Sequence, residues 1–389
     1  MELATPCFVF DKGIFINNIA DLLREFRALF ADVIVGYSFK TNNLPAVLSA
    51  AYGNGCYAEV VSDAEYELAK CIGFSSSKII FNGPIKGNDC LVNAVENGAI
   101  INIDSWNELN MYAGLQKDKK KGVGLRVNID IESYLPGQSV TGEQGGRFGF
   151  NYENKELHKA IEVCRRNGIP VDGLHMHVSS KTKSLDVFKL LSEMAVRISE
   201  KESLDLKYID IGGGFFGGND GGKAYKEYAK VIYEGLRPLK NVSIIIEPGA
   251  SVVATAFSYI VSVVESKKTN RSRFVITDGT RIHIDPFFNK DRYDYSVVST
   301  DNGENRRIVD QQIICGYTCM EHDRIMNICE KMELKQGDRI IFNTVGSYTL
   351  GFNMMFIRFL PRVYMKDDLE YSLVRSEWSV DEFLQKCIW

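Results

Sequence analysis

The chain has 389 residues, of which 45% are hydrophobic and 25% are charged, so it is long enough for a large barrel domain and a smaller second domain. Its formal net charge of -4 and its pI near 5.9 exclude the broad basic surface that nucleic-acid binding requires. The opening residues lack a signal-peptide pattern, and no apolar run reaches membrane-spanning length. We therefore expect a cytoplasmic protein with no membrane partner.

The nine cysteines do not indicate a disulfide framework or a zinc site, because their number is odd and none are paired at C-x-x-C spacing. His175 and His177 lie two residues apart, but no carboxylate or third ligand follows them at a familiar spacing. We therefore predict no metal.

The first predicted element is the strand "TPCFVFD", which precedes the first helix and stands apart from the strands that follow. Chain termini often come together at a domain surface, so this strand is expected to join the C-terminal domain.

Eight β-branched runs then alternate with helix-like stretches such as 63–72 and 155–167, a pattern typical of a parallel sheet. An open, doubly wound sheet is the competing architecture, but no reversal point is evident and eight strands suit closure. The sequence therefore predicts a (β/α)8 TIM barrel over residues 16–252. The runs are Val33–Lys40, Cys56–Ser62, Lys78–Gly83, Ala99–Ser105, Val123–Ile129, Gly173–Ser180, Tyr208–Gly214 and Ser243–Ser251.

After residue 252 the pattern changes to short strands separated by turn signals, with little helix. This pattern predicts an all-β domain, of the β-barrel kind, made of residues 1–15 and 253–389. Examples of the predicted strands are Phe257–Val264, Phe274–Thr277, Ile308–Cys315, Arg339–Asn343 and Arg362–Met365.

Polar residues gather at the C-terminal ends of the eight runs, which form one face of a barrel and carry its active site. Lys40 ends the first run, in "VGYSFKTNN". Burial lowers the pKa of a lysine, and a neutral amine forms an imine with a carbonyl cofactor. A solvated lysine at a strand end is the simpler alternative.

Two turns on the same face indicate a phosphate site. In "IDIGGGF", Gly212, Gly213 and Gly214 follow a strand and leave backbone N–H groups unobstructed. "EPGAS" follows the last strand, and barrels commonly bind phosphate in the loops after strands 7 and 8. Either turn alone could simply be a tight connection.

Two further residues suit an aromatic nitrogen heterocycle. Glu247, at the end of the eighth run, could keep a pyridine nitrogen protonated, because an opposite charge favours the charged form. His177 is nearer the rim than His175 and could pack flat on such a ring. The alternatives are a glutamate bonded to a turn and a satisfied core histidine.

These segments resemble the fold-type III pyridoxal 5′-phosphate (PLP) decarboxylases, the group of diaminopimelate, ornithine and arginine decarboxylases. The resemblance covers nearly the whole chain in order. It rests on "TPCFVFD", "YSFKTNN", "AEVVSDAE", "GRFGF", "GLHMHVSS", "IDIGGGF", "EPGAS", "CGYTCMEHD" and "VGSYTLGF".

The resemblance implies that Lys40 is the Schiff-base lysine, that His177 stacks on the cofactor ring, and that Glu247 pairs with the ring nitrogen. It also implies a homodimer with shared active sites, in which Cys319 from the partner subunit acts near the substrate. The other implied cofactor-binding residues are Arg126, Ser180, Gly212, Gly213, Gly214, Gly249 and Tyr348, and the implied substrate-binding residues are Glu321 and Asp323.

The chain departs from the family pattern at two positions. Ala250 replaces the arginine of Glu-Pro-Gly-Arg, and Met320 replaces the acid that follows the cysteine in diaminopimelate decarboxylases. Glu321 could compensate if the loop shifts register. The hypothesis is an amino-acid decarboxylase whose substrate is neither diaminopimelate nor ornithine, but a related or conjugated amino acid of siderophore, antibiotic or polyamine-type biosynthesis.

Two other functions remain open. A PLP-dependent alanine racemase shares the barrel and lysine, but it usually continues the lysine as Ala-Asp-Ala-Tyr-Gly-His-Gly and has an arginine where Glu247 stands. A non-catalytic homologue that binds a protein partner is the second alternative.

Overall fold

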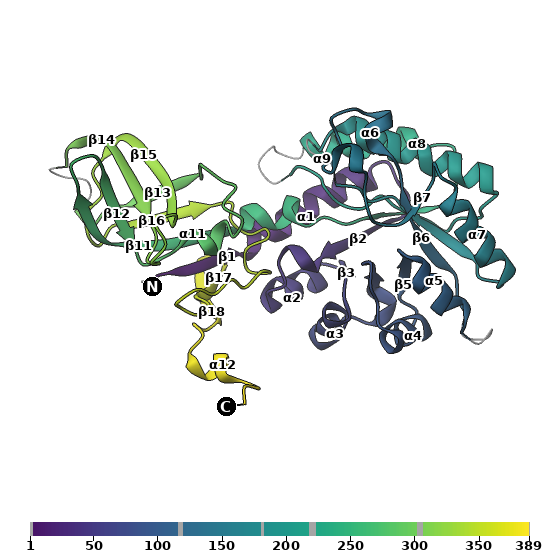
Figure 1. Cartoon of the computed structure of the whole chain (residues 1–389), viewed down its shortest axis with the longest axis horizontal. Helices are drawn as coiled ribbons and strands as arrows, with labels where there is room; N and C mark the ends of the chain where they lie inside the picture. The colour runs from purple at the N-terminus through teal and green to yellow at the C-terminus, as the bar shows by residue number, and fades with distance from the viewer. Residues whose placement is uncertain (1–2, 116–119, 180–182, 218–222, 302–305, 389) are drawn as a thin grey trace. The chain divides into compact units, whose positions relative to one another are not determined.

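The computed structural model describes residues 3–115, 120–179, 183–217, 223–301 and 306–388 (Figure 1). The chain forms two compact units. One unit contains Ile16–Lys40 and Leu48–Val252, and the other contains Met1–Phe15, Thr41–Val47 and Val253–Trp389. The short segment that follows Lys40 therefore belongs with the second unit, which the sequence pattern did not indicate.

The first unit is built on a closed parallel barrel. Its strands are hydrogen-bonded in the order β5-β4-β3-β2-β10-β9-β8-β6, and pairing of β5 with β6 closes the ring. The predicted (β/α)8 barrel is thus confirmed. The strands are β2 (Val33–Ser38), β3 (Tyr57–Val60), β4 (Ile79–Phe81), β5 (Ile100–Ile103), β6 (Val123–Asn128), β8 (Val171–His175), β9 (Tyr208–Asp210) and β10 (Ser243–Ile246); β7 (Phe150–Asn151) pairs with β6 outside the ring.

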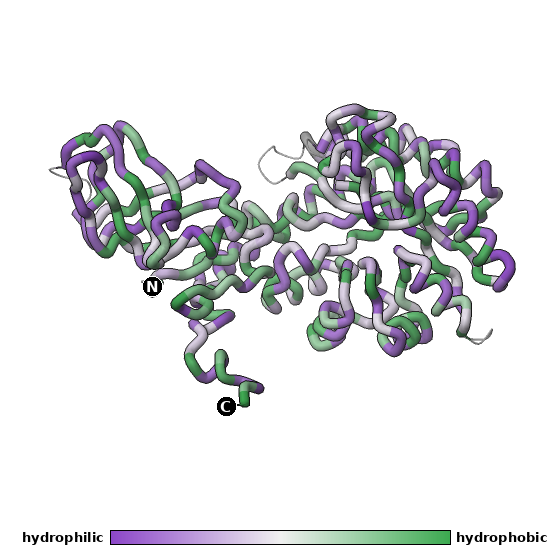
Figure 2. Tube along the Cα trace, in the orientation of Figure 1, coloured by the Kyte–Doolittle hydropathy of each residue, from purple (hydrophilic) through white to green (hydrophobic). Residues whose placement is uncertain are grey.

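Helices alternate with these strands because their sequences are amphipathic. In α7 the buried residues are Leu157, Ala160, Ile161 and Cys164, which recur at helical spacing and form one apolar face. Figure 2 shows hydrophobic and hydrophilic residues mixed along the helices. The helices are α1 (Lys12–Arg27), α2 (Pro45–Gly53), α3 (Asp63–Ile72), α4 (Asn88–Glu96), α5 (Trp106–Ala113), α6 (Ile131–Tyr134), α7 (Glu156–Arg166), α8 (Leu185–Glu202), α9 (Lys223–Leu236) and α10 (Ala250–Val253).

Each observed barrel strand ends earlier than its predicted run. β2 ends at Ser38, so Lys40 lies in the short 3-10 turn Phe39–Thr41 that follows it. β8 ends at His175, so His177 lies beyond the strand, and Glu247 comes directly after β10. The candidate site residues therefore sit in the connections at the C-terminal end of the barrel, where active sites of this architecture lie.

The second unit is built on a nine-stranded sheet, as the predicted all-β domain requires. The N-terminal strand β1 pairs antiparallel with β11 and parallel with β17, so its expected addition to this domain is confirmed. The elements are β1 (Cys7–Asp11), β11 (Phe257–Lys268), β12 (Arg273–Thr277), α11 (Arg281–Ile284), β13 (Tyr295–Val298), β14 (Ile308–Cys315), β15 (Arg324–Met332), β16 (Arg339–Asn343), β17 (Arg362–Asp367), β18 (Glu370–Arg375) and α12 (Val380–Leu384).

Among the described residues, none of the helices is long and apolar enough to cross a membrane.

Candidate active site

Lys40 makes its closest contact with a buried carboxylate inside the barrel. Its Nζ donates a hydrogen bond of 2.6 Å to Glu59 Oε2, from the end of β3. The same oxygen accepts a 2.6 Å hydrogen bond from the Ser38 hydroxyl. The side chain of Glu59 is 1% exposed and that of Lys40 is 37% exposed, so the lysine reaches from the surface to a buried carboxylate that fixes its amine close to the end of β2.

Glu247 and Asp210 form a second acidic group in the same interior. Both are buried, and Asp210 is hydrogen-bonded to Glu247. Burial and the Glu247 charge raise the pKa of Asp210 well above its usual value. Burial opposes ionisation of Glu247 as well, but attraction to His175, Lys40 and His177 outweighs it and holds the Glu247 pKa below its usual range. The two pKa values are thus shifted in opposite directions, which favours a proton on Asp210 and the negative charge on Glu247.

His175 and His177 present parallel rings whose centroids are 6.1 Å apart and whose planes differ by 18°. Nε2 of His175 lies 3.6 Å from Glu247 Oε2. Burial lowers the pKa of His177 to about 3, so this imidazole stays neutral in ordinary buffers. A neutral, flat ring therefore lies near the carboxylate pair.

The triple glycine forms a turn that only glycine fits. Gly212 has φ +75°, and a Cβ there would lie 2.4 Å from the His177 Cβ. A Cβ on Gly213 would lie 2.3 Å from the Glu247 carbonyl oxygen. The N–H groups of Gly212 and Gly213 donate inward, to Asp210 Oδ1 at 3.0 Å and to His177 Nδ1 at 3.2 Å. This differs from the expectation of unobstructed N–H groups, because two of the three glycines use theirs inside the barrel.

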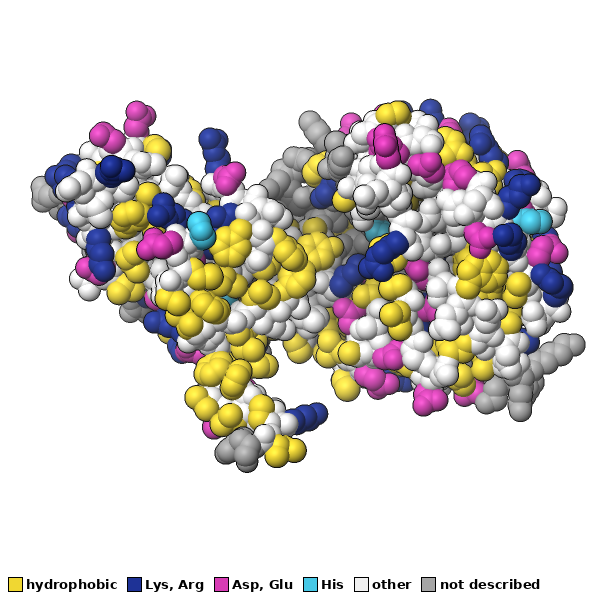
Figure 3. All heavy atoms as spheres, in the orientation of Figure 1, with side chains coloured by type: hydrophobic (Ala, Val, Ile, Leu, Met, Phe, Trp, Pro, Cys, Tyr) yellow, Lys and Arg dark blue, Asp and Glu magenta, His cyan; other side chains and the backbone are white. Residues whose placement is uncertain are grey.

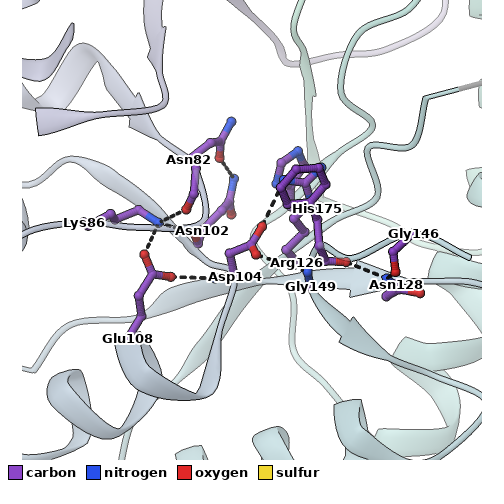
Figure 4. Close-up of polar contacts among 12 residues, drawn as sticks. Asn82, Lys86, Asn102, Asp104, Glu108, Arg126, Asn128, Gly146, Gly149 and His175 are labelled. Atoms are coloured by element: carbon purple, nitrogen blue, oxygen red, sulfur yellow. Dashed lines mark hydrogen bonds and ion pairs between the residues drawn. The ribbon is translucent and has the colours of Figure 1, made fainter. Parts of the chain in front are cut away.

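Arg126 lies on β6, on the opposite side of the barrel from β2 and Lys40. Its Nη1 donates to Asp104 Oδ2 at 2.9 Å, and its Cζ lies 4.6 Å from the centre of the Phe148 ring (Figure 4). Its buried Nε has no hydrogen-bond partner among the described residues. A cavity of about 440 Å³ adjoins Arg126 and His177 and is lined further by residues 139–141 and 144–148.

The carboxylate of Asp323, a predicted substrate contact, is hydrogen-bonded to neighbouring groups of the second unit. Its carboxylate accepts hydrogen bonds from the Thr280 hydroxyl (3.0 Å), the Arg281 N–H (2.9 Å), the Thr318 N–H (3.2 Å) and the Thr318 hydroxyl (2.7 Å). A side chain at Gly316 would collide with this carboxylate, because a Cβ there would lie 2.1 Å from Asp323 Oδ2. Asp323 therefore holds the loop after β14 in shape. This differs from the expectation that it extends toward a substrate.

The remaining predicted residues are placed as follows. Cys319 is exposed, and the side chain of Glu321 is 93% exposed with a carboxylate oxygen 3.7 Å from Arg324. Tyr348 has φ +54° and donates its N–H to the Thr41 carbonyl at 2.9 Å. Gly249 accepts a hydrogen bond from Val252 N–H, while Ser180 lies outside the described residues.

The sequence argument missed three interior residues: Glu59, Asn82 and Asp210. Each lies within or directly after a short apolar strand, where a single polar residue is a signal because burying it demands a partner. Asn82 donates to both Glu59 and Glu247, and Asn102 donates to Asn82 and to Asp210. The polar groups thus form one connected network from Lys40 to Glu247.

This set of residues fits the PLP that the resemblance implies. Glu247 is buried and its pKa is held low, so a protonated ring nitrogen would be a suitable further partner for its carboxylate. Lys40 would supply an amine for the covalent link and His177 would supply a flat neutral face. A Cβ on Gly214 would have no described neighbour closer than 4.0 Å apart from its chain neighbours, so this glycine would leave its side open to a phosphate.

Comparison with known proteins gives relatives along nearly the whole chain. The chain is 26% identical over 395 residues to a probable chloroplastic diaminopimelate decarboxylase of Oryza sativa subsp. japonica, covering 98% of this chain and 79% of the relative. It is 27% identical over 363 residues to diaminopimelate decarboxylase of Aquifex aeolicus, covering 90% and 83%.

Solved structures share the fold. Diaminopimelate decarboxylase from Helicobacter pylori, complexed with L-lysine, superposes with a TM-score of 0.83 at 22% identity, covering 98% of this chain and 96% of that one. Arginine decarboxylase of Paramecium bursaria Chlorella virus, bound to agmatine, superposes with a TM-score of 0.77 at 21% identity, covering 94% and 96%.

The model of the family "Pyridoxal-dependent decarboxylase, pyridoxal binding domain" matches residues 16–254, which is more than half of the chain. PLP is the cofactor that this domain binds, and the family's enzymes are carboxy-lyases. The chain therefore belongs to the pyridoxal-dependent decarboxylase family.

Proposed function

We propose that the protein releases carbon dioxide from an amino acid at the C-terminal end of its barrel, with Lys40 as the covalent anchor of PLP. One observation carries this proposal. A lysine amine, Lys40, and a buried glutamate, Glu247, lie at the two ends of a single hydrogen-bonded network. That arrangement suits a cofactor with an aldehyde on one side and a ring nitrogen on the other.

PLP, when bound, supplies a ring that accepts the electron pair left when the bond to the substrate carboxylate breaks. The protein residues set the conditions for this step. Glu247, whose pKa is held low, would favour a proton on the ring nitrogen by its opposite charge. His177 would offer a neutral face to the ring and add no competing positive charge.

The proposed phosphate contacts are Gly212 to Gly214, Gly249, Ser180 and Tyr348, with Arg126 near the ring. Among the glycines, Gly214 is best suited to donate its N–H outward, because Gly212 and Gly213 already donate inward. The salt bridge to Asp104 supports the placement of Arg126, since it fixes one end of the guanidinium and leaves Nε to serve a ligand.

For the substrate, we propose an amino acid other than diaminopimelate or ornithine, with a bulky or conjugated side chain of the siderophore, antibiotic or polyamine type. Met320 supports this, because a neutral side chain stands where an acid would recognise a distal amine. Asp323 is committed to its loop, which leaves the exposed Glu321 as the acid able to contact a substrate. The named relatives favour diaminopimelate, so it must be included in any test.

We further propose a homodimer in which Cys319 of the partner subunit donates a proton near the reacting carbon. Exposed apolar side chains support an interface on the second unit, and Figure 3 shows such side chains gathered on the part that leads to the C-terminus. They include Phe352, Met354, Met355, Phe356 and Ile357.

The deciding experiment compares wild type with Lys40→Ala after PLP is added and excess cofactor is removed. Wild type should show a visible absorption band that borohydride abolishes, and Lys40→Ala should lack both the band and carbon dioxide release. Lys207→Ala is the matched control, because Lys207 is an exposed barrel lysine paired with Asp172. An unaltered band in Lys40→Ala would refute the assignment, and diaminopimelate as the best substrate of a broad panel would refute the substrate proposal.

A further inference from the structure

Asn82 occupies a central position in the buried network. It follows β4 and is buried, and its Nδ2 donates to Glu59 Oε1 at 3.0 Å and also to Glu247 Oε1. Glu59 is the carboxylate that receives the Lys40 amine. One amide nitrogen therefore joins the group beside Lys40 to the group at the end of β10.

The orientation of this amide follows from its neighbours. The Tyr208 hydroxyl donates to Asn102 Oδ1 at 2.9 Å, which leaves Asn102 Nδ2 to donate onward. Asn102 Nδ2 donates to Asn82 Oδ1 at 2.8 Å (Figure 4). The Asn82 oxygen is thereby used as an acceptor, and both N–H bonds of its nitrogen face carboxylates. The chain of donors thus runs in one direction, from Tyr208 to the two glutamates.

We propose that Asn82 is a positioning residue that holds the carboxyl groups of Glu59 and Glu247 at fixed places in the cofactor site. This inference rests on the proposed roles of Lys40 and Glu247. Hydrogen bonds to an anion are stronger than bonds between neutral groups, and a buried anion needs such donors to remain charged. Among the described residues, Asn82 is the side chain hydrogen-bonded to both carboxylates.

Asn82→Asp separates this role from simple packing, because aspartate has nearly the same shape but replaces the donor with a third carboxylate between two anions. We expect kcat at about pH 8 to fall about 100-fold in Asn82→Asp and about tenfold in Asn82→Ala, with KM changed less than kcat. A packing role predicts the reverse order. Relative to wild type, Asn82→Asp should recover as the pH falls, because a protonated carboxyl can donate one hydrogen bond.

Thermal unfolding of the cofactor-free protein provides a readout independent of catalysis. The new carboxyl of Asn82→Asp should have a raised pKa in the folded state, so its stability is highest at low pH and is lost as the pH rises. Its melting temperature should fall below that of Asn82→Ala at about pH 8 and approach it at about pH 5. Asn343→Ala is the control, since Asn343 also donates to a carboxylate, Asp294, but on the second unit.

Two outcomes would overturn the inference: Asn82→Asp as active as Asn82→Ala at about pH 8, or parallel melting curves for both variants across the pH range. Failure of the proposed function would look different. In that case wild type itself would form no borohydride-sensitive band, while the unfolding of the cofactor-free variants would still decide whether Asn82 holds the two carboxylates.

Discussion

Two buried carboxylates, Glu247 in the barrel and Asp323 in the second unit, are equally removed from water but differ in what surrounds them. Asp323 receives four hydrogen bonds from neutral backbone and hydroxyl donors. Glu247 receives a bond from Asn82, shares a proton-bearing neighbour in Asp210, and faces His175 at 3.6 Å.

The difference separates a structural acid from a functional one. Neutral donors fully satisfy Asp323, so nothing further is required of a ligand there. The pKa of Glu247 is held low while that of the adjacent Asp210 is raised, and oppositely shifted pKa values in one buried pair are typical of functional sites. Burial alone would have ranked Glu247 and Asp323 alike, whereas the kind of partner that surrounds each carboxylate distinguishes them.

The largest expected effect is on catalysis, from Glu247→Gln. Removing the anion that holds a proton on the ring nitrogen should lower kcat about a thousandfold, with little change in melting temperature. Steady-state carbon dioxide release and calorimetry of the same preparation would measure both quantities. Glu202→Gln, at a buried glutamate on α8, is the control and should retain activity. If Glu247→Gln turned over substrate as fast as wild type, Glu247 would not have a functional role that distinguishes it from Asp323.

Asp323→Ala should give the opposite result. Leaving four donors without their acceptor should cost about 3 kcal/mol of folding free energy, while the cofactor band at low temperature stays intact. Thermal unfolding followed by fluorescence and by the visible band would test this. Asp310→Ala, at an exposed position on β14, should unfold like wild type. Loss of the band in a folded, thermally normal Asp323→Ala protein would contradict the assignment.

The smallest effect is a change of pH dependence in Asp210→Asn. The folded pKa of Asp210 is raised, so its contribution to stability is complete below its unfolded pKa and is lost as the pH rises toward the folded value. Asparagine cannot ionise, so the free energy of unfolding of the variant should increase relative to that of wild type by about 1.4 kcal/mol per pH unit over that window. Asp172→Asn, at a half-buried aspartate paired with Lys207, should show no such gain. Identical stability profiles would place a charged Asp210 beside Glu247.

The sequence was sufficient to predict the barrel and the strand that begins the chain, because β-branched runs and amphipathic helices are local patterns. Strands β13, β15 and β18 were not singled out from the sequence, since few of their residues are buried and little apolar alternation marks them. The predicted barrel strands extend too far at their C-terminal ends, because the apolar pattern continues beyond the last residue that is paired with a neighbouring strand.

The candidate site was predictable only in part. Lys40, His177 and Glu247 stand at strand ends, where topology alone brings them to one face. Glu59 and Asn82 could not be assigned, because their meaning depends on partners in other strands; Asn82 and Glu247 are 165 residues apart. The role of Asp323 likewise depends on Thr280 and Arg281, which no spacing within its motif reveals.

The turn after β4 affects the chemical stability of Asn82. Gly83, which follows Asn82, has φ +92°, and a Cβ there would lie 2.2 Å from the Val61 carbonyl oxygen, so the turn requires glycine. Asparagine is a thermolabile residue, and a following glycine leaves the next backbone nitrogen unshielded for deamidation. Attack of that nitrogen on the side-chain carbonyl carbon of Asn82 would release ammonia and form a cyclic imide, which water would open to aspartate or isoaspartate. Either product would replace the amide donor that joins the two glutamates with a carboxylate, so this turn is a site where slow chemical ageing would alter the buried network.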